Sequence, residues 1–100
     1  MAVTYTIVHE RPSTDVAWYS MTSDMQSRID HFKSTGDIVS FDIVQNSDLK
    51  STGTLVFKDS TSEATVINDS DWITFREAMK TQYNNSSIIT LKQDRNHNIV

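Results

Sequence analysis

The chain has 100 residues, a formal net charge of −4 and no cysteine. This length allows one hydrophobic core, so residues 1–100 are expected to form a single domain. The lack of cysteine excludes disulfides and thiolate metal sites, and it favours synthesis inside a cell. No basic stripe and no long apolar run occur, so neither nucleic acid nor a membrane is an expected partner.

Residues 3–9 alternate apolar and polar side chains, which predicts a half-buried strand. Pro12 ends this strand because it has no N–H to donate. The next apolar residues recur with helical spacing: Trp18, Met21, Met25, Ile29 and Phe32. The expected helix covers about residues 22–34, with Ser20, Thr22 or Ser23 as its N-cap and Gly36 as its C-terminal stop. Alternatively, residues 16–19 form an extended segment that leads into this helix.

Two strands are expected next, over residues 37–45 and 52–58, joined as an antiparallel hairpin. The spacing places five residues on their buried faces: Val39, Phe41, Ile43, Leu55 and Phe57. Residues 63–68 fit either a short third strand or an irregular approach to the next helix, and both interpretations stay open.

The clearest helical pattern covers about residues 70–83, where the apolar residues are Trp72, Phe75, Met79 and Tyr83. The polar residues 68–71 form its start. Residues 87–93 then predict a final strand with Ile89 and Leu91 on one face, followed by a polar tail.

This element order predicts an α+β fold of the ferredoxin-like type. Right-handed crossovers place both amphipathic helices on one face of a four- or five-stranded, mainly antiparallel sheet. The expected order of the four main strands across the sheet is four, one, three, two.

No catalytic, cofactor-binding or metal-ligating residues are predicted. Asp69 and Asp71 have the spacing of a cation site, but they lack further oxygen ligands, so a helix cap is the better interpretation. The histidines His9, His31 and His97 show no metal-ligand spacing. His9 ends a strand and is therefore expected to be an ordinary exposed residue.

Five residues are candidates for contacts with other protein chains, through self-association or a larger assembly: Tyr19, Asn96, His97, Ile99 and Val100. Tyr19 lies off the apolar stripe of the first helix, where an exposed aromatic side chain is a good anchor. The other four lie at the chain end, which is ordered only where something ties it down.

The chain resembles two groups of proteins. Its element order is similar to that of the dimeric α+β barrels, which include small monooxygenases and polyketide-shaping proteins. No residue can be matched to the histidine-and-asparagine pocket expected there. The chain also resembles small proteins of contractile-tailed phages of marine cyanobacteria, in Thr-Tyr-Thr-Ile at 4–7, Glu-Arg-Pro at 10–12, Ser-Asp-Leu at 47–49 and Tyr-Asn at 83–84.

The absence of catalytic motifs and the phage resemblance favour a non-enzymatic structural or interaction protein. The expectation is a subunit of a bacteriophage particle (tail, baseplate or capsid accessory), made in the host cytoplasm, located in the virion and without a deep pocket. The alternative is a dimeric α+β-barrel enzyme or small-ligand binder of the monooxygenase type. That alternative requires a pocket between helices and sheet, near Trp18, Tyr19, His31 or Trp72.

Overall fold

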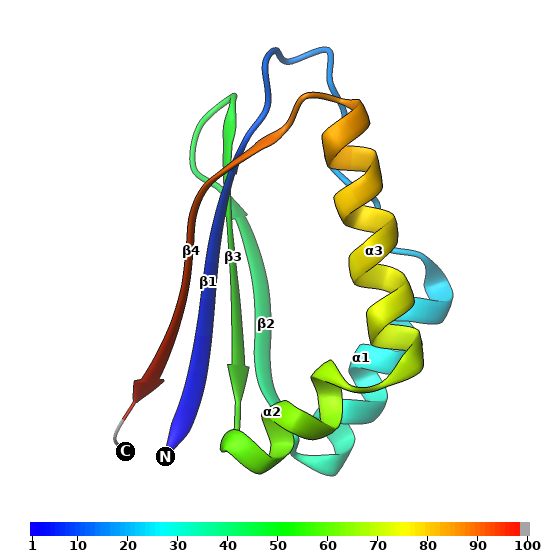
Figure 1. Ribbon diagram of the computed structural model, residues 1–100, viewed down its shortest axis with the longest axis vertical. Coiled ribbons are helices and arrows are strands. Elements are labelled where there is room, and N and C mark those ends of the chain that lie inside the picture. The colour runs from blue at the N-terminus through cyan, green and yellow to red at the C-terminus, as the bar shows by residue number, and fades with distance from the viewer. Residues whose placement is uncertain (99–100) are drawn as a thin grey trace.

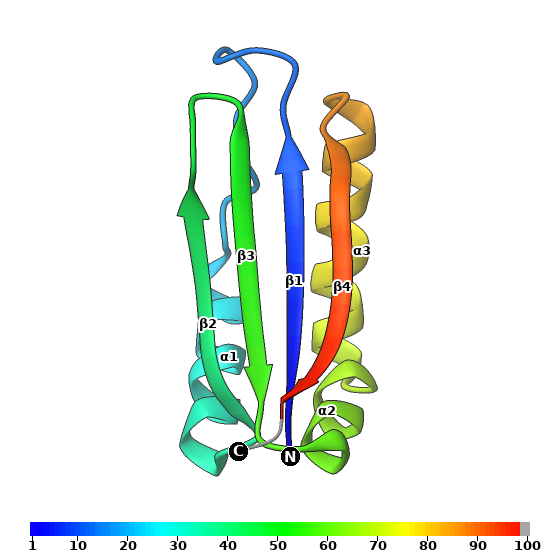
Figure 2. The same ribbon diagram turned by 90° about the vertical axis from the view of Figure 1, so that its left-hand side faces the viewer.

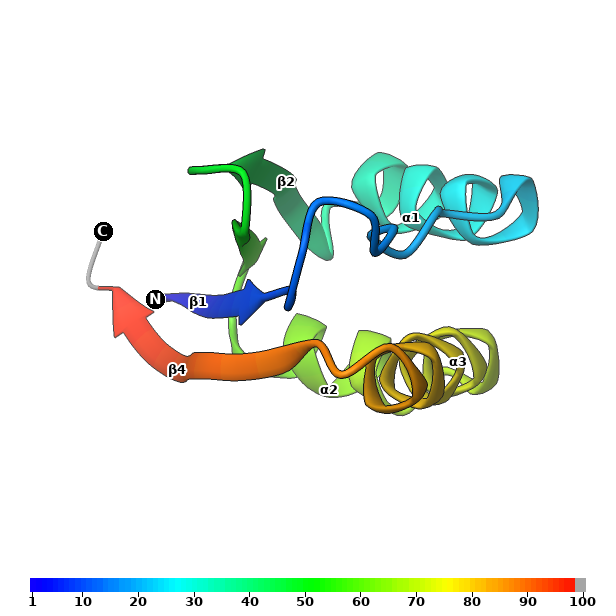
Figure 3. The ribbon, with the colours of Figure 1, turned by 90° about the horizontal axis from the view of Figure 1, so that it is seen from above.

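The structure, a computed structural model that describes residues 1–98, places three helices on one face of a four-stranded antiparallel sheet (Figures 1 and 3). The elements are β1 (Ala2–Glu10), α1 (Ser23–Thr35), β2 (Ile38–Gln45), β3 (Lys50–Phe57), α2 (Ser60–Ile67), α3 (Ser70–Asn85) and β4 (Ile89–Asn98). The strands lie side by side in the order β2-β3-β1-β4 (Figure 2), which confirms the expected α+β fold and its strand order.

Helix α1 begins and ends at the residues that the sequence singles out. The Thr22 hydroxyl accepts the Met25 N–H at 3.2 Å. Gly36 follows the last turn with a φ of 87°, and its N–H donates to the Lys33 carbonyl at 3.2 Å. Glycine adopts this left-handed conformation without the Cβ clash that other residues meet. Residues 17–22 precede the helix, so the extended lead-in is the correct interpretation there.

Residues 60–67 form helix α2, so neither of the two interpretations of residues 63–68, a short third strand or an irregular segment, is correct. Asp59 accounts for the difference, because its carboxylate accepts the Ser62 N–H at 2.8 Å and caps the helix. That hydrogen bond holds the pKa of the Asp59 carboxyl below its usual value. Capping, together with complete burial of Val66, outweighs the strand preference of the β-branched residues here.

One position of β2 faces differently from the expectation. The pairing of β2 with β3 shifts between Ile38 and Ser40, so Ile38 is buried while Val39 is 60% exposed. An extra residue at such a shift breaks the alternation of faces along the strand. In the last strand Ile88 is buried, whereas Ile89 and Leu91 are largely exposed, and β4 continues through the expected polar tail.

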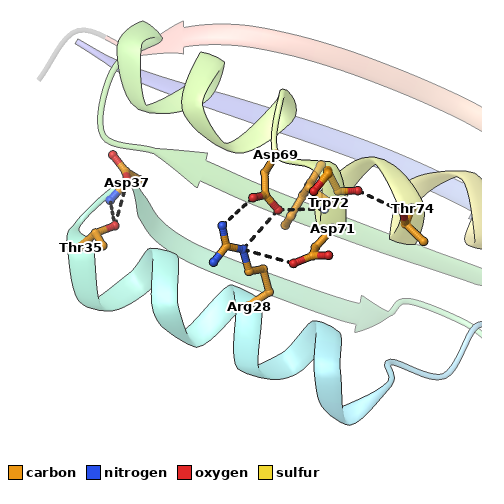
Figure 4. A network of polar contacts seen from close by, with 8 residues as sticks. Arg28, Thr35, Asp37, Asp69, Asp71, Trp72 and Thr74 are labelled. Atoms are coloured by element: carbon orange, nitrogen blue, oxygen red, sulfur yellow. Dashed lines mark hydrogen bonds and ion pairs between the residues drawn. The ribbon is translucent and has the colours of Figure 1, made fainter.

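Helices α1 and α3 are joined by a charged contact (Figure 4). The Arg28 guanidinium donates to both carboxylate oxygens of Asp69, at 2.5 and 3.2 Å. Asp69 also caps α3 by accepting the Trp72 N–H at 3.0 Å. The guanidinium holds the pKa of this carboxyl below its usual value. Asp69 therefore acts as the helix cap that the sequence favours over a cation ligand.

Candidate functional site

A cavity of about 270 Å³ lies between the sheet and α3. It extends from Ile67 and Trp72, where α2 meets α3, to Tyr83 near the end of α3. The connecting segment before α1 contributes Tyr19 and Met21 to its wall. The volume lies just below the roughly 300–1,000 Å³ of typical small-molecule sites, so a small organic molecule fits.

The cavity exists because β3 carries small residues along half of its length. Phe57 and Leu55 fill the space next to α1 and α2, whereas Gly53 and Ser51 occupy the next positions on the same face. A Cβ atom at Gly53 would lie 3.3 Å from the Ile7 Cγ2. Gly53 therefore contributes no side chain to the floor of the cavity, and this leaves space there for a ligand.

Aromatic rings form a continuous wall on the helical side of the cavity. The ring centroids of Tyr19 and Phe75 lie 5.4 Å apart, and those of Trp72 and Phe75 lie 5.7 Å apart. Phe41 extends the wall from β2 with its ring centroid 6.4 Å from that of Trp72. Such edge-to-face clusters hold their rings rigidly and favour flat, apolar ligands.

Polar groups gather at the end of the cavity nearest the C-terminus of α3. His9 lies there, directly opposite Ser51 in the pairing of β1 with β3. The His9 and Tyr83 rings meet edge to face, with centroids 4.7 Å apart. The Tyr83 hydroxyl accepts the Tyr19 N–H at 3.3 Å, which leaves its own proton available to a ligand.

Burial sets the charge of these groups. His9 is only 8% exposed, and burial lowers the pKa of its imidazole, which keeps the ring neutral at pH 7. Burial also raises the pKa of the Tyr83 hydroxyl, partly offset by the Tyr19 N–H, so the phenol keeps its proton. This end of the cavity thus offers one neutral base beside the hydroxyl groups of Tyr83 and Ser51.

The sequence anticipates this site only in part. Trp72 and Tyr19 line the cavity, Trp18 packs behind Tyr83 with ring centroids 6.3 Å apart, and His31 is exposed on α1. The expectation that His9 is exposed is wrong. The signal lies in the strand itself, because His9 is in phase with Val3, Tyr5 and Ile7 on the face that the helices cover.

The other predicted contact residues lie elsewhere. Tyr19 is half-buried against Phe75. Asn96 and His97 belong to β4 and pair with Thr4 and Val3 of β1. Ile99 and Val100 lie outside the described residues. Within residues 1–98, no group of three or more His, Asp or Glu side chains is placed to hold a metal ion, and no helix is long and apolar enough to cross a membrane.

Comparison with known proteins gives a fold but no family. No family model and no curated protein sequence matches the chain. The solved structure of SnoaB, a cofactor-independent oxygenase from Streptomyces nogalater, matches 99% of this chain and 94% of that one, with a TM-score of 0.62 and 9% identity. A structure of a mutant of the same oxygenase matches 95% of this chain and 88% of that one, with a TM-score of 0.54 and 9% identity.

These neighbours overturn the expectation of a non-enzymatic phage subunit, together with its viral and virion assignment. The matching fold is that of an oxygenase, and the cavity between the sheet and α3 is the feature that the structural-subunit hypothesis excluded. The alternative in the sequence analysis, an α+β-barrel enzyme or small-ligand binder, accounts for both findings. Catalytic motifs were a poor guide because the groups at the cavity come from strands and helices far apart in the sequence.

Proposed function

We propose that this chain is an enzyme that oxygenates a flat aromatic small molecule with dioxygen and without a cofactor. The observation that carries the proposal is the aromatic-walled cavity with His9, Ser51 and Tyr83 together at one end, in a chain that shares its fold with a cofactor-independent oxygenase. The aromatic wall orients a flat ring system, and the hydroxyl groups of Tyr83 and Ser51 bind the polar edge of that ring system.

The absence of a cofactor from the proposed reaction defines the substrate. Dioxygen has two unpaired electrons and reacts slowly with ordinary closed-shell molecules, so the substrate itself must supply the electrons. A carbon acid does so once it has lost a proton, if the resulting carbanion is spread over aromatic rings and a carbonyl group. The substrate class is therefore a polycyclic phenol or ketone with a CH2 group between unsaturated rings.

Oxygen consumption by the purified protein tests the proposal. The assay uses a tricyclic hydroxylated ketone with an acidic CH2 group, after the protein has been dialysed against a chelator. The proposal predicts uptake of dioxygen in proportion to protein concentration and above the spontaneous rate. Tryptophan fluorescence reports binding separately, because Trp72 lines the cavity. Binding without any uptake of dioxygen would make the chain a ligand binder rather than an enzyme.

A matched pair of variants on β3 ties the activity to the cavity. Gly53→Val adds a side chain to the floor next to Ile7 and is expected to abolish both binding and oxygen uptake. Thr52→Val is the control, because the neighbouring side chain points to the opposite face of the same strand and is absent from the cavity wall. Equal losses in the two variants would mean that the activity does not reside in this cavity.

A further inference from the structure

We propose that His9 is the catalytic proton acceptor of this cavity and that the Tyr83 hydroxyl binds the substrate oxygen whose charge grows as the proton leaves. This inference rests on the proposed function and assigns its chemistry to particular residues. It concerns a buried histidine at the end of β1 that has no role in the packing of the apolar core.

The position of His9 is fixed from several sides. Its backbone is paired with Ser51 on β3 and with Thr90 on β4, next to the irregularity in the β1–β4 pairing between Val8 and His9. Its ring is held edge-on against Tyr83. A base held by two neighbouring strands and a helix keeps its nitrogen atoms at a constant place relative to a bound ligand.

The imidazole nitrogens of His9 remain available to a ligand. Among the residues that the structure describes, none forms a hydrogen bond with the His9 ring, and burial is the cause of the lowered pKa of this group. An imidazole nitrogen without a protein partner is free to accept a hydrogen bond or a proton from a ligand.

The surroundings of His9 are sparsely charged. The titratable groups that line the cavity besides His9 are Tyr83 and Arg76 on α3, Tyr19 on the connecting segment, Tyr5 on β1 and Asp94 on β4. The cavity-lining residues of β2 and β3 are not titratable. The tyrosines act as hydrogen-bond donors at neutral pH, and a neutral imidazole next to them is the strongest base on the cavity wall.

The proposed reaction balances without another reactant. His9 takes a proton from the CH2 group, and the electron pair stays on the substrate as a delocalised carbanion. This carbanion adds to dioxygen, and the resulting peroxide anion takes the proton back from the imidazolium to give a hydroperoxide. Loss of the second C–H proton to His9 breaks the O–O bond. The carbon becomes a carbonyl, hydroxide leaves, and hydroxide takes the proton from His9 to form water.

The test compares His9→Gln with His31→Gln, which removes an exposed histidine on α1. Glutamine is polar and cannot accept a proton, so kcat of His9→Gln is expected to fall roughly 100- to 10,000-fold. In the wild-type protein kcat/KM should stay level as the pH drops through the usual imidazole pKa of about 6.5, and fall only below it, because burial favours the neutral base. His31→Gln should keep both the rate and this profile.

The outcomes separate the two proposals. No oxygen uptake by the wild-type protein would contradict the proposed function itself. Uptake by the wild-type protein together with an unchanged rate and pH profile in His9→Gln would overturn the role of His9 and leave the proposed function standing. Binding of a ketone analogue without the acidic CH2, followed by tryptophan fluorescence, shows whether His9→Gln still has an intact cavity.

Imidazole NMR of the wild-type protein provides a measurement that does not depend on folding of a variant. The His9 resonance should titrate below the usual imidazole pKa of about 6.5. A phenolic ligand should shift the His9 resonance while leaving that of His31 in place. A His9 resonance that does not respond to a saturating ligand would contradict contact between this imidazole and the substrate.

Discussion

Glu63 is a buried carboxylate at the start of α2, on the opposite side of the core from the cavity end that holds His9. It is 6% exposed and accepts hydrogen bonds from the Tyr5 hydroxyl and the Arg95 guanidinium. Burial and the neighbouring Glu63 carboxylate raise the pKa of the Tyr5 phenol. One side chain thus connects α2, β1 and β4, and it holds the polar strand β4 against the rest of the sheet.

Glu63→Gln should destabilise the fold. The amide keeps the shape of the side chain but loses the charge that Arg95 and Tyr5 share, and hydrogen bonds to charged groups stabilise by about 1.5–3 kcal/mol. Denaturant unfolding measures this loss. The control is Glu77→Gln on the exposed face of α3, which should leave the midpoint unchanged. Equal midpoints for wild type and Glu63→Gln would show that the contact does not stabilise the fold.

The Arg28–Asp69 ion pair gives a prediction with a defined pH dependence. Asp69→Asn keeps a good helix cap but removes the charge, so the variant should be less stable than the wild type at pH 7. The pKa of the Asp69 carboxyl is lowered in the folded state, so the unfolded chain binds this proton more tightly. The difference in the free energy of unfolding between wild type and Asp69→Asn should be complete above the usual aspartate pKa of about 3.9. It should disappear as the pH falls through the lowered pKa of Asp69 in the folded state.

Unfolding curves of wild type and Asp69→Asn at several pH values check this dependence. Asp71→Asn is the control, because Asp71 is largely exposed and lies 3.9 Å from Arg28. A difference between wild type and Asp69→Asn that persists unchanged in strong acid would mean that the ion pair is not its source.

At the scale of the elements, helix ends determine the architecture more strongly than strand propensity. Thr22, Asp59 and Asp69 each cap a helix by accepting the N–H three residues further along. The first and third caps lie where the sequence predicts helix starts. Residues 63–68 were interpreted as a short strand or an irregular approach to the next helix, so α2 was missed although Asp59 offers the same capping chemistry at its start.

Gly36→Ala tests a helix end directly. The left-handed backbone at Gly36 costs a non-glycine residue about 1–2 kcal/mol, and a Cβ atom there would meet nothing within 4 Å. The expected loss in the free energy of unfolding is therefore purely conformational. Gly36→Asn should lose less, because asparagine tolerates this conformation better. Equal stability of Gly36→Ala and wild type would contradict the left-handed cap.

The sequence predicts the fold class, the strand order and the two longer helices because each depends on regular spacing. It fails where the spacing slips, because the irregularity between Ile38 and Ser40 exposes Val39, which was expected on the buried face. The site was missed for a different reason. Ser51 and Gly53 appear unremarkable along the chain, and only the packing of α3 against the sheet turns their small size into a cavity.

At the scale of the whole molecule, the sheet face opposite the helices is open (Figure 2). Its side chains on the central strands are threonine and valine, from Thr4, Thr6 and Val8 on β1 to Thr52, Thr54 and Val56 on β3. The edge strands β2 and β4 add polar and charged residues to this face, such as Ser40, Asp42, Lys92 and Asp94. Four strands of this length cover about 30 by 19 Å. Because the side chains make this face uneven, its accessible area is larger than the flat rectangle and approaches the roughly 800 Å² that each partner contributes to a standard interface. We propose that a second copy of the chain binds there.

Sedimentation analysis tests this self-association. The wild type should form a dimer, whereas Val56→Lys, which places a charge on the open face beside Thr4 and Ser40, should be monomeric. Ser27→Lys on the exposed side of α1 is the control and should stay dimeric. A wild-type protein that remains monomeric up to high concentration would contradict the proposed pairing.

Incorporation of isotopically labelled dioxygen tests the central claim most directly. The purified, chelator-treated protein is incubated with the polycyclic ketone under labelled dioxygen, and the product is analysed by mass spectrometry. The account predicts a new carbonyl group that carries one labelled oxygen atom, formed by wild type and Thr52→Val but not by Gly53→Val. Product formation at the spontaneous rate in all three proteins would contradict oxygenation in this cavity.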